Sequence, residues 1–389
     1  MEHTISDLYQ MQSLPLRAKV LMTKQRIRDW YDHYNGEVYV SFSGGKDSTV
    51  LLDITRSMYA DVEAVFVDTG LEYPEIREFV KTFDNVTILK PKKTFKQVIN
   101  EYGYPFFSKE ISEAVYYGRK YLTRLAEIEN ANDRQTDRQT DRKIVGASQF
   151  ADLLGVDRRK DKNNKAWLQI KTGNIPSCPI RVQQLLGIAE GKDGEDTTLF
   201  DKSKYIFMLD APFEISNRCC GVMKKAPIKQ YNKATGKKPI TAQMAEESMQ
   251  RTQKWLKNGC NGFEMNNPIS NPLSFWTEQD ILEYIKENNL PICSVYGDIV
   301  IDYEAEGQLE GQLELFERPH KLKTTGCNRT GCMFCGFGCH LEKQSRFELM
   351  KRTHPKQYEY IMKPKEEGGL DYKNVIDWIN EHGKMNIRY

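Results

Sequence analysis

Ser43-Gly44-Gly45-Lys46-Asp47-Ser48 is the stretch that decides the fold. It lies between a β-rich run, Glu37–Phe42 (EVYVSF), and a helical pattern over Thr49–Met58. Paired glycines let a backbone approach a phosphate without a clash at Cβ, and the helix that follows offers free N–H groups to an anion. Lys46 adds a positive charge, and the serines add hydroxyl donors. The Walker loop instead needs four residues between its first glycine and its Gly-Lys pair. The stretch therefore predicts a phosphate-binding loop of another kind.

Strands and helices alternate on both sides of this loop. Residues 1–35 have apolar side chains at helical spacing. After the loop, Val62–Val67 predicts a second strand, Tyr73–Phe83 a helix with Pro74 in its first turn, and Val86–Leu89 a third strand. This alternation is typical of an α/β fold in which helices cover both faces of a parallel sheet.

A weaker pattern covers residues 118–205, which we treat as an insertion or subdomain. Ser108–Asn130 predicts one long helix leading into it. The DRQT repeat at Asp133–Arg142 has no apolar residue with which to form a core. We interpret this repeat as a solvated linker or helix extension, with an arm that contacts a partner as the alternative.

Further elements follow the insertion. Tyr205–Asp210 is strand-like, and helices are predicted over Thr241–Lys257, Thr277–Asn288 and Lys373–His382. Thr277 and Asp280 resemble a capping box at the start of the second of these helices. We expect five segments. An N-terminal helical part covers 1–35, a nucleotide-binding core 36–117 and the insertion 118–205. The rest of the core with substrate-side helices covers 206–320, and a cysteine-rich metal-binding lobe with a C-terminal helix covers 321–389.

Composition restricts the class of protein. The 389 residues carry 56 basic and 54 acidic side chains, so the net charge of +2 gives no general attraction to nucleic acid or membrane. No apolar run approaches the ~20 residues of a membrane span, and the first thirty residues lack the apolar core of a signal peptide. We therefore expect a cytoplasmic protein with no membrane partner. In that compartment, nine cysteines favour metal or redox chemistry over disulfides.

Two motifs carry a resemblance to a known family. Ser43–Ser48 resembles the loop of the PP-loop ATP pyrophosphatases, the adenine nucleotide α-hydrolase superfamily. Asp68–Glu75 (DTGLEYPE) resembles the second signature of its phosphoadenosine phosphosulfate (PAPS) reductase branch. The resemblance implies an enzyme that binds ATP or an adenylylsulfate-type nucleotide and acts at the α-phosphate. The residues it assigns to the nucleotide are Ser43, Gly44, Gly45, Lys46, Asp47, Ser48, Asp68, Thr69 and Gly70.

The same resemblance assigns catalytic roles to Lys46, Asp47, Asp68 and Arg251. Asp68 lies at the carboxyl end of a predicted strand, where ligands bind in open α/β sheets. It would hold Mg²⁺ or orient the phosphate loop, and the alternative is a helix-capping carboxylate. Glu247, Ser248 and Arg251 resemble the family's substrate segment, in which the planar guanidinium binds phosphate or sulfate. Glu247 and Arg251 are alternatively an ordinary ion pair four residues apart on a helix.

The cysteines offer two metal-ligand sets. A Cys-x2-Cys pair lets both sulfurs reach one metal centre. By resemblance to bacterial adenylylsulfate reductases, a 4Fe–4S cluster would be held by Cys219, Cys220, Cys332 and Cys335. The alternative is a compact set that also suits Zn²⁺: Cys327, Cys332, Cys335 and Cys339. We favour the first set, because it draws on two separately matching motifs.

The resulting hypothesis is a PP-loop enzyme that forms AMP or pyrophosphate. A sulfur donor protein or a nucleic-acid substrate would take part in the later chemistry. One alternative is a genuine sulfonucleotide reductase that produces sulfite. Another is a non-catalytic, zinc-stapled module that binds nucleotides or nucleic acid. The reductases of this family use a mobile C-terminal cysteine as nucleophile. The fifty residues after Cys339 contain no cysteine, so we expect no thioredoxin-dependent release of sulfite.

Overall fold

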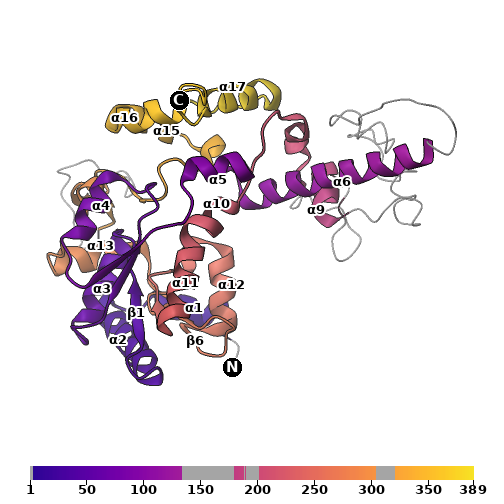
Figure 1. Cartoon of the computed structure of the whole chain (residues 1–389). Helices are drawn as coiled ribbons and strands as arrows, with labels where there is room; N and C mark the ends of the chain where they lie inside the picture. Colours follow the sequence, from indigo (N-terminus) through magenta and orange to yellow (C-terminus); the bar gives the residue numbers. More distant parts are fainter. Residues whose placement is uncertain (1–2, 134–178, 188, 190–200, 304–319) are drawn as a thin grey trace. The chain divides into compact units, whose positions relative to one another are not determined.

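The computed structural model describes residues 3–133, 179–187, 189, 201–303 and 320–389 (Figure 1). The chain divides into two compact units. The first unit comprises Met1–Thr94 and Val222–Met333, and the second comprises Phe95–Gly221 and Phe334–Tyr389. This division crosses the segments 36–117, 206–320 and 321–389, which the sequence treats as single parts. Most of the DRQT repeat lies outside the described residues.

The first unit is built on a six-stranded sheet with the order β3-β2-β1-β5-β7-β6. The strands are β1 Val38–Ser41, β2 Ala64–Val67, β3 Val86–Leu89, β5 Lys238–Ile240, β6 Asn261–Gly262 and β7 Ile269–Ser270. Every pairing in this sheet is parallel except that of β6 with β7. The predicted α/β class with a mainly parallel sheet is confirmed. The chain proceeds from β1 outward to β2 and β3, and then returns to place β5 on the other side of β1. This strand order creates a switch point at β1, where α/β folds bind ligands.

Helices pack on both faces of this sheet. Among the described residues of the first unit, the α-helices are α1 Ile5–Gln12, α2 Leu16–His33, α3 Lys46–Arg56, α4 Pro74–Lys81, α11 Ala226–Thr235, α12 Met249–Asn258 and α13 Glu278–Glu287. Alternate residues of β1 explain the two layers. Val38 and Val40 belong to the core that includes Ile27 of α2 and Leu51 of α3. Tyr39 points the other way, and its hydroxyl donates to Asn232 of α11 at 2.8 Å.

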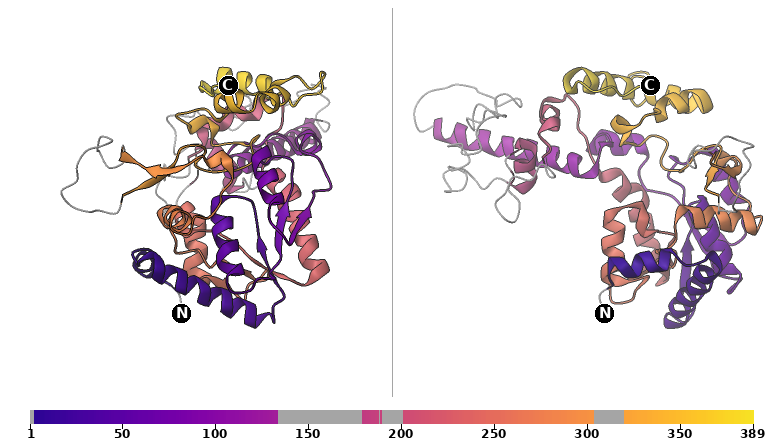
Figure 2. Two further views of the ribbon diagram at one scale, coloured as in Figure 1. Left: turned by 90° about the vertical axis from the view of Figure 1, so that its left-hand side faces the viewer. Right: turned by 180° about the vertical axis from the view of Figure 1, so that it is seen from behind.

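Two smaller features complete the first unit. The antiparallel strands β8 Ile299–Ile301 and β9 Leu322–Thr324 pair with each other, and they form the orange ribbon in the left view of Figure 2. The 3₁₀ turn η5, Ser294–Tyr296, precedes β8. Thr277 caps α13 and shares a complete capping box with Asp280, as the sequence predicts.

Two sequence predictions were wrong. Tyr205–Asp210 is not a strand but part of the 3₁₀ helix η2, Ser203–Asp210. A short apolar run does not by itself distinguish a strand from a buried helical turn. The helix expected from Thr241 begins only at Met249, because the serine at Ser248 provides its N-cap. The residues before it form the 3₁₀ turn η4, Ala245–Glu247.

The second unit is mainly helical. The elements that the structure describes there are α5 Phe95–Tyr102, β4 Phe106–Phe107, α6 Lys109–Asp133, α9 Ile180–Leu186, η2, α10 Arg218–Cys220, β10 Gly336–Phe337, η6 Cys339–Leu341, α15 Arg346–Thr353, α16 Pro355–Met362 and α17 Tyr372–Gly383. The short strands β4 and β10 pair in parallel. Tyr372 is fully buried in this unit, and its hydroxyl donates to the Phe334 carbonyl at 2.6 Å. None of the helices in the described ranges is both long and apolar enough to cross a bilayer.

Candidate functional site

The phosphate loop connects the carboxyl end of β1 to the first turn of α3, as predicted. Gly44 has a φ of +70°, which is a left-handed conformation that glycine adopts without strain. A Cβ atom at Gly44 would lie 2.8 Å from Val80 Cγ2 and 2.9 Å from Ile76 Cγ2. The packing of α4 against the loop therefore requires a residue without a side chain at this position.

Hydroxyl groups brace the loop from inside. The Ser43 N–H donates to Ser48 Oγ at 3.1 Å, and Ser48 Oγ donates to the Gly45 carbonyl at 2.9 Å. Thr49 Oγ1 donates to the same carbonyl at 3.0 Å. The Ser43 and Ser48 hydroxyls lie 3.0 Å apart. These bonds hold the loop in its turn, so its shape does not depend on a bound anion.

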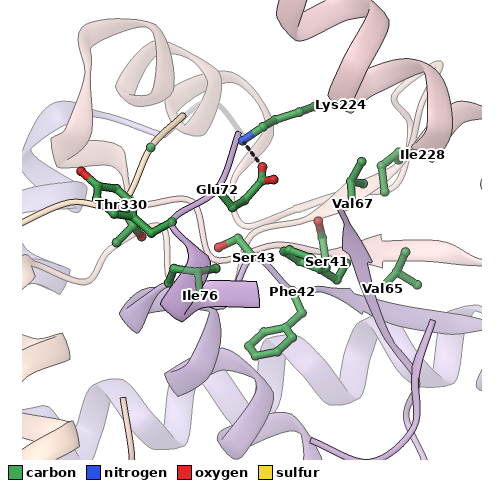
Figure 3. Close-up of a pocket in the computed structure, with 13 residues that line it drawn as sticks. Ser41, Phe42, Ser43, Val65, Val67, Glu72, Ile76, Lys224, Ile228 and Thr330 are labelled. Carbon is green, nitrogen blue, oxygen red and sulfur yellow. Dashed lines mark ion pairs between the residues drawn. The ribbon is translucent and has the colours of Figure 1, made fainter. Parts of the chain in front are cut away.

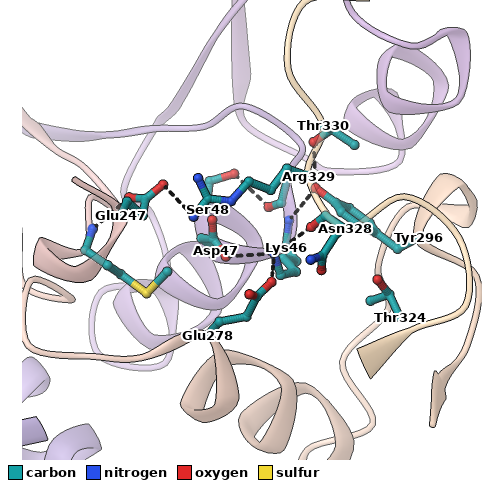
Figure 4. Close-up of polar contacts among 12 residues, drawn as sticks. Lys46, Asp47, Ser48, Glu247, Glu278, Tyr296, Thr324, Asn328, Arg329 and Thr330 are labelled. Carbon is teal, nitrogen blue, oxygen red and sulfur yellow. Dashed lines mark hydrogen bonds and ion pairs between the residues drawn. The ribbon is translucent and has the colours of Figure 1, made fainter. Parts of the chain in front are cut away.

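Lys46 is the most buried charged residue of the loop, with 3% of its surface exposed. Its Nζ donates to the Asn328 carbonyl at 3.0 Å and lies 3.1 Å from Glu278 Oε1 and 3.7 Å from Asp47 Oδ1 (Figure 4). The Tyr296 ring lies below the ammonium, with its centroid 5.7 Å away. Two carboxylates and a carbonyl thus surround the ammonium group that would attract a phosphate.

Asp47 responds to the same surroundings. Burial raises the pKa of its carboxyl, the nearby Lys46 ammonium opposes this rise, and the Glu278 carboxylate adds to it. Arg329 lies close enough to Asp47 to lower that pKa in turn. Asp47 Oδ1 is buried and accepts no hydrogen bond within the described part of the chain. A proton or a cation at this oxygen would therefore stabilise the buried Asp47 carboxylate.

The second signature follows the end of β2. Asp68 Oδ1 accepts from the Gly70 N–H at 3.1 Å, and Asp68 Oδ2 accepts from Arg77 Nη2 at 3.0 Å. The Thr69 N–H and hydroxyl both donate to the Glu72 carboxylate, the hydroxyl at 2.8 Å. Tyr73, not Asp68, occupies the N-cap position of α4. Asp68 therefore fixes the turn between β2 and α4 and does not cap the helix.

A cavity of about 150 Å³ opens beside the ends of β1 and β2 (Figure 3). Its walls are mostly apolar and belong to the first unit, and the polar groups gather at one side. The lining residues that matter for binding are Ser41, Ser43, Val65, Val67, Glu72, Ile76, Lys224, Ile228 and Thr330. Lys224 Nζ lies 3.4 Å from Glu72 Oε1. An apolar cleft with a few convergent polar groups is the usual form of a small-molecule site.

The predicted substrate segment lies at the start of α12. Ser248 caps this helix by accepting from the Arg251 N–H at 3.4 Å. Glu247 pairs with the Arg251 guanidinium, so the ordinary ion pair considered from the sequence is present. Glu247 Oε1 also lies 3.8 Å from Arg329 Nη2. Burial lowers the pKa of Arg251, the neighbouring Arg329 lowers it further, and Asp47 opposes both effects. The structure therefore brings this segment to the phosphate loop.

Sequence reasoning missed several residues of the site. Glu278, Tyr296, Asn328, Arg329 and Thr330 surround the loop but come from distant segments. Asn328, Arg329 and Thr330 lie between Cys327 and Cys332, and this position beside a candidate metal motif was the one available signal.

The structure divides the candidate metal ligands between the two units. Cys327 and Cys332 belong to the first, while Cys219, Cys220, Cys335 and Cys339 belong to the second. All eight cysteines within the described residues are free of disulfides. In those residues, no three His, Cys, Asp or Glu side chains are arranged to hold a metal ion. Both ligand sets stay predictions.

Each unit nevertheless surrounds its thiols with distinctive groups. Burial works to lower the pKa of Lys224, but Cys332 and Glu72 beside it raise that pKa above its usual value. In the second unit, burial holds the pKa of Tyr372 well above its usual range, and the nearby Cys335 and Cys219 raise it further. Cys219 and Cys335, which are distant in the sequence, thus lie near one buried tyrosine.

A family model and several known proteins match parts of this chain. A family model described as the phosphoadenosine phosphosulfate reductase domain matches residues 37–146 and 192–336. An uncharacterised protein of Methanocaldococcus jannaschii is 34% identical over 95 residues, which are 23% of this chain and 23% of that protein. Adenosine 5'-phosphosulfate reductase 1 of Bacillus subtilis is 28% identical over 92 residues, which are 22% of this chain and 40% of that enzyme. The chain thus spans less than half the length of either relative.

A solved structure also aligns with this chain. The crystal structure of phosphoadenylyl-sulfate (PAPS) reductase from Candida auris, in complex with phosphate, aligns with 76% of this chain and 91% of that one. The sequence identity is 13% and the TM-score is 0.31.

Proposed function

Because the chain belongs to the phosphoadenosine phosphosulfate reductase family, we propose that it is an enzyme that binds an adenine nucleotide and reacts at its α-phosphate. The observation that carries this proposal is the continuity of the cavity with the phosphate loop. Ser43 belongs to both, and Thr330, whose hydroxyl lies near Gly45, also lines the cavity. A nucleotide has the matching form, with an apolar base attached through a sugar to a chain of anionic groups.

The cavity walls suit the base. Val65, Val67 and Ile228 offer apolar contacts, while Glu72 and Lys224 offer polar groups at one side. With the base in this cavity, the phosphates would follow from Ser43 along the loop. The ends of the loop are braced by its own hydroxyls, so binding requires little rearrangement of the backbone.

The charged residues would act on the phosphate chain. Lys46 would exchange Glu278 and the Asn328 carbonyl for phosphate oxygens, and Arg251 and Arg329 would bind the outer anionic group. In the proposed reaction, an acceptor oxygen forms a bond to the α-phosphorus while the bond to pyrophosphate breaks. Pyrophosphate leaves with the electron pair, and the fixed positive charges stabilise the charge that develops on it. The product is an adenylated acceptor, which in one version is a nucleic acid. Sulfur from a donor protein would later form a bond to the acceptor, and AMP would leave with the electron pair of the broken bond.

Mg²⁺ bound to the nucleotide would neutralise part of the phosphate charge. Both oxygens of Asp68 already accept a bond, so a positioning role suits Asp68 better than metal binding. Asp47, with a buried oxygen that accepts no hydrogen bond in the described structure, is the carboxylate that fits this cation. We propose the 4Fe–4S cluster on Cys219, Cys220, Cys332 and Cys335, with the compact set as the alternative. A bound cluster would supply electron transfer or structural support.

The burial of Cys339 argues against the reductase alternative. A thiol that attacks a sulfonucleotide and then meets a reducing protein must be accessible. Cys339 has 5% of its surface exposed, and burial raises the pKa of its thiol to about 12. This cysteine is therefore a poor nucleophile for sulfite production.

The test is a product assay. Anaerobic protein is incubated with Mg²⁺ and, separately, with ATP, adenylylsulfate and PAPS, and pyrophosphate, AMP and sulfite are measured. We expect pyrophosphate from ATP, and its loss in Lys46→Ala and Asp47→Ala with the fold retained by circular dichroism. Lys81→Ala is the control, because Lys81 is exposed and pairs only with Glu78 in the described contacts. Sulfite that disappears in Cys339→Ser would restore the reductase reading.

A further inference from the structure

Three hydroxyl groups from separate segments converge on Gly45. A Cβ atom at Gly45 would lie 3.2 Å from Ser43 Oγ, 3.2 Å from the Tyr296 hydroxyl and 3.4 Å from Thr330 Oγ1. Ser43 belongs to the phosphate loop, Tyr296 to the 3₁₀ turn η5, and Thr330 to the segment that precedes Cys332. All three belong to the first unit, so their arrangement does not depend on the second.

The Tyr296 hydroxyl is fixed in this position by both of its neighbours. It accepts from the Lys46 N–H at 3.2 Å and lies 2.6 Å from Thr330 Oγ1 (Figure 4). The Gly326 N–H donates to the Tyr296 carbonyl at 2.8 Å, which ties the approaching segment to η5. Tyr296 has 2% of its surface exposed. The hydroxyl pair is therefore held against the loop and is not a chance contact of mobile side chains.

A count of protons separates this pair from the serines. Ser48 Oγ donates to the Gly45 carbonyl, so the short contact between the two serines uses the proton of Ser43. Tyr296 and Thr330 together own two hydroxyl protons, and their mutual bond uses one. The Tyr296 oxygen also accepts from Lys46, which consumes a lone pair and no proton. Within the contacts of the described residues, the pair retains one proton to donate.

The cavity shows where this proton can go. Thr330 and Ser43 both line it, next to the polar side that Glu72 and Lys224 form (Figure 3). Building on the proposed nucleotide function, we propose that the Tyr296 and Thr330 hydroxyls are part of the phosphate-binding site. There they donate a hydrogen bond to an oxygen of the phosphate chain as it passes from the cavity to Gly45. The segment before Cys332 would thus complete the phosphate loop from the opposite side.

This assignment predicts a loss that depends on the anionic part of the ligand. Tyr296→Phe and Thr330→Val each remove a hydroxyl and keep most of the side chain's shape. Either hydroxyl left alone keeps its own proton, so the full loss is expected of the double variant, which has neither. A variant that cannot make a hydrogen bond to a charged ligand group binds that ligand about ten- to hundred-fold more weakly. We expect this loss for ATP and for inorganic pyrophosphate, while the affinity for adenosine changes by less than about two-fold.

Matched controls come from hydroxyls elsewhere in the same unit. Tyr284→Phe removes a hydroxyl that donates to Asp53 at 2.7 Å, and Thr55→Val removes one that donates to the Leu51 carbonyl at 2.7 Å. Both controls should bind ATP as the unaltered protein does. Affinities are measured by isothermal titration calorimetry on the full chain, and thermal unfolding checks that each variant is folded.

The outcomes separate the two proposals. Unaltered protein that binds neither ATP nor adenosine refutes the nucleotide function, and the hydroxyl assignment with it. Protein that binds ATP equally well with and without the two hydroxyls refutes the assignment alone. Tighter binding of ATP by Tyr296→Phe also refutes it, because it would mean that the tyrosine only occupies the Lys46 N–H. Equal losses for adenosine and ATP would mean that the substitutions deform the cavity, which again overturns the assignment.

Discussion

Glu278→Gln is the substitution that best tests how the charge of Lys46 is held. Glu278 Oε1 lies 3.1 Å from Lys46 Nζ, and the two side chains are 31% and 4% exposed. Glutamine keeps the size of the side chain and removes only its charge. Loss of one partner from a buried pair costs about 3–5 kcal/mol of stability. The Asn328 carbonyl and Asp47 stay in place, and Glu278 is partly solvated, so we expect about 1–2 kcal/mol less unfolding free energy.

Ligand binding should change in the opposite direction. A phosphate that replaces Glu278 next to Lys46 is repelled by the carboxylate it displaces. For unit charges about 6 Å apart and an effective dielectric constant of about 50, Coulomb's law gives roughly 1 kcal/mol. Removing the carboxylate should therefore tighten the binding of ATP about five-fold. The gain should shrink at high salt, because screening weakens charge interactions near the surface.

The assay pairs urea unfolding with titration calorimetry at two salt concentrations. The control is Glu287→Gln, at the exposed C-terminal end of the same helix α13, which should change neither quantity. A Glu278→Gln protein that is less stable but binds ATP more tightly would support the geometry. General damage to the structure would instead lower both the unfolding free energy and the affinity for ATP. Weaker ATP binding in a folded Glu278→Gln protein would refute the view that Glu278 competes with the ligand.

Three further predictions concern the loop and the cysteines. Gly44→Ala should destabilise the fold by more than about 2 kcal/mol in thermal unfolding. The alanine Cβ would clash with Val80 and Ile76, and its backbone would have to adopt the positive φ of Gly44. The control is Gly221→Ala, because a Cβ at Gly221 would face open space. Burial raises the pKa of Asp47 in the fold, so its contribution to stability is complete below pH 3.8 and is lost as the pH rises through the raised value. Urea unfolding across this range should accordingly show a flatter pH dependence for Asp47→Asn, and an unchanged slope would contradict the burial of this carboxyl. Anaerobic protein should contain about four irons per chain, and Cys332→Ser should abolish this iron content. Loss of iron in Cys219→Ser would support the first ligand set, and loss of iron in Cys339→Ser would support the compact set. Bound zinc without iron would exclude the cluster.

Local sequence signals predicted the strand and the helix on either side of Ser43–Ser48. Ser43–Ser48 and the strand before it were recognisable because glycine, serine and lysine have roles there that depend on near neighbours. The capping box of Thr277 and Asp280 is confirmed for the same reason, since three residues determine it. The helix expected from Thr241 was wrong because its true start depends on Ser248, and periodicity alone does not choose between two candidate caps.

The residues that surround Lys46 were not predictable in this way. Glu278 lies 232 positions away in the sequence, and its position follows from the packing of α13 against α3. Tyr296 and Thr330 reach Gly45 only because backbone bonds between Gly326 and η5 bring their segments together. Long-range packing of this kind leaves no periodic pattern in a single sequence. The residues that surround the glycine-rich loop are therefore the ones that the sequence alone could not identify.

If the loop binds anions as proposed, the enclosure of Lys46 would also determine which anions occupy it in a crowded solution. Every ligand that uses this ammonium must first separate it from Glu278 and Asn328, and this cost is the same for all of them. A uniform cost multiplies all dissociation constants by one factor. Abundant weak binders, such as orthophosphate, then fall below saturation, while a ligand anchored at a second point remains bound. The protein would in this way keep its loop vacant among common anions and ready for a scarcer one.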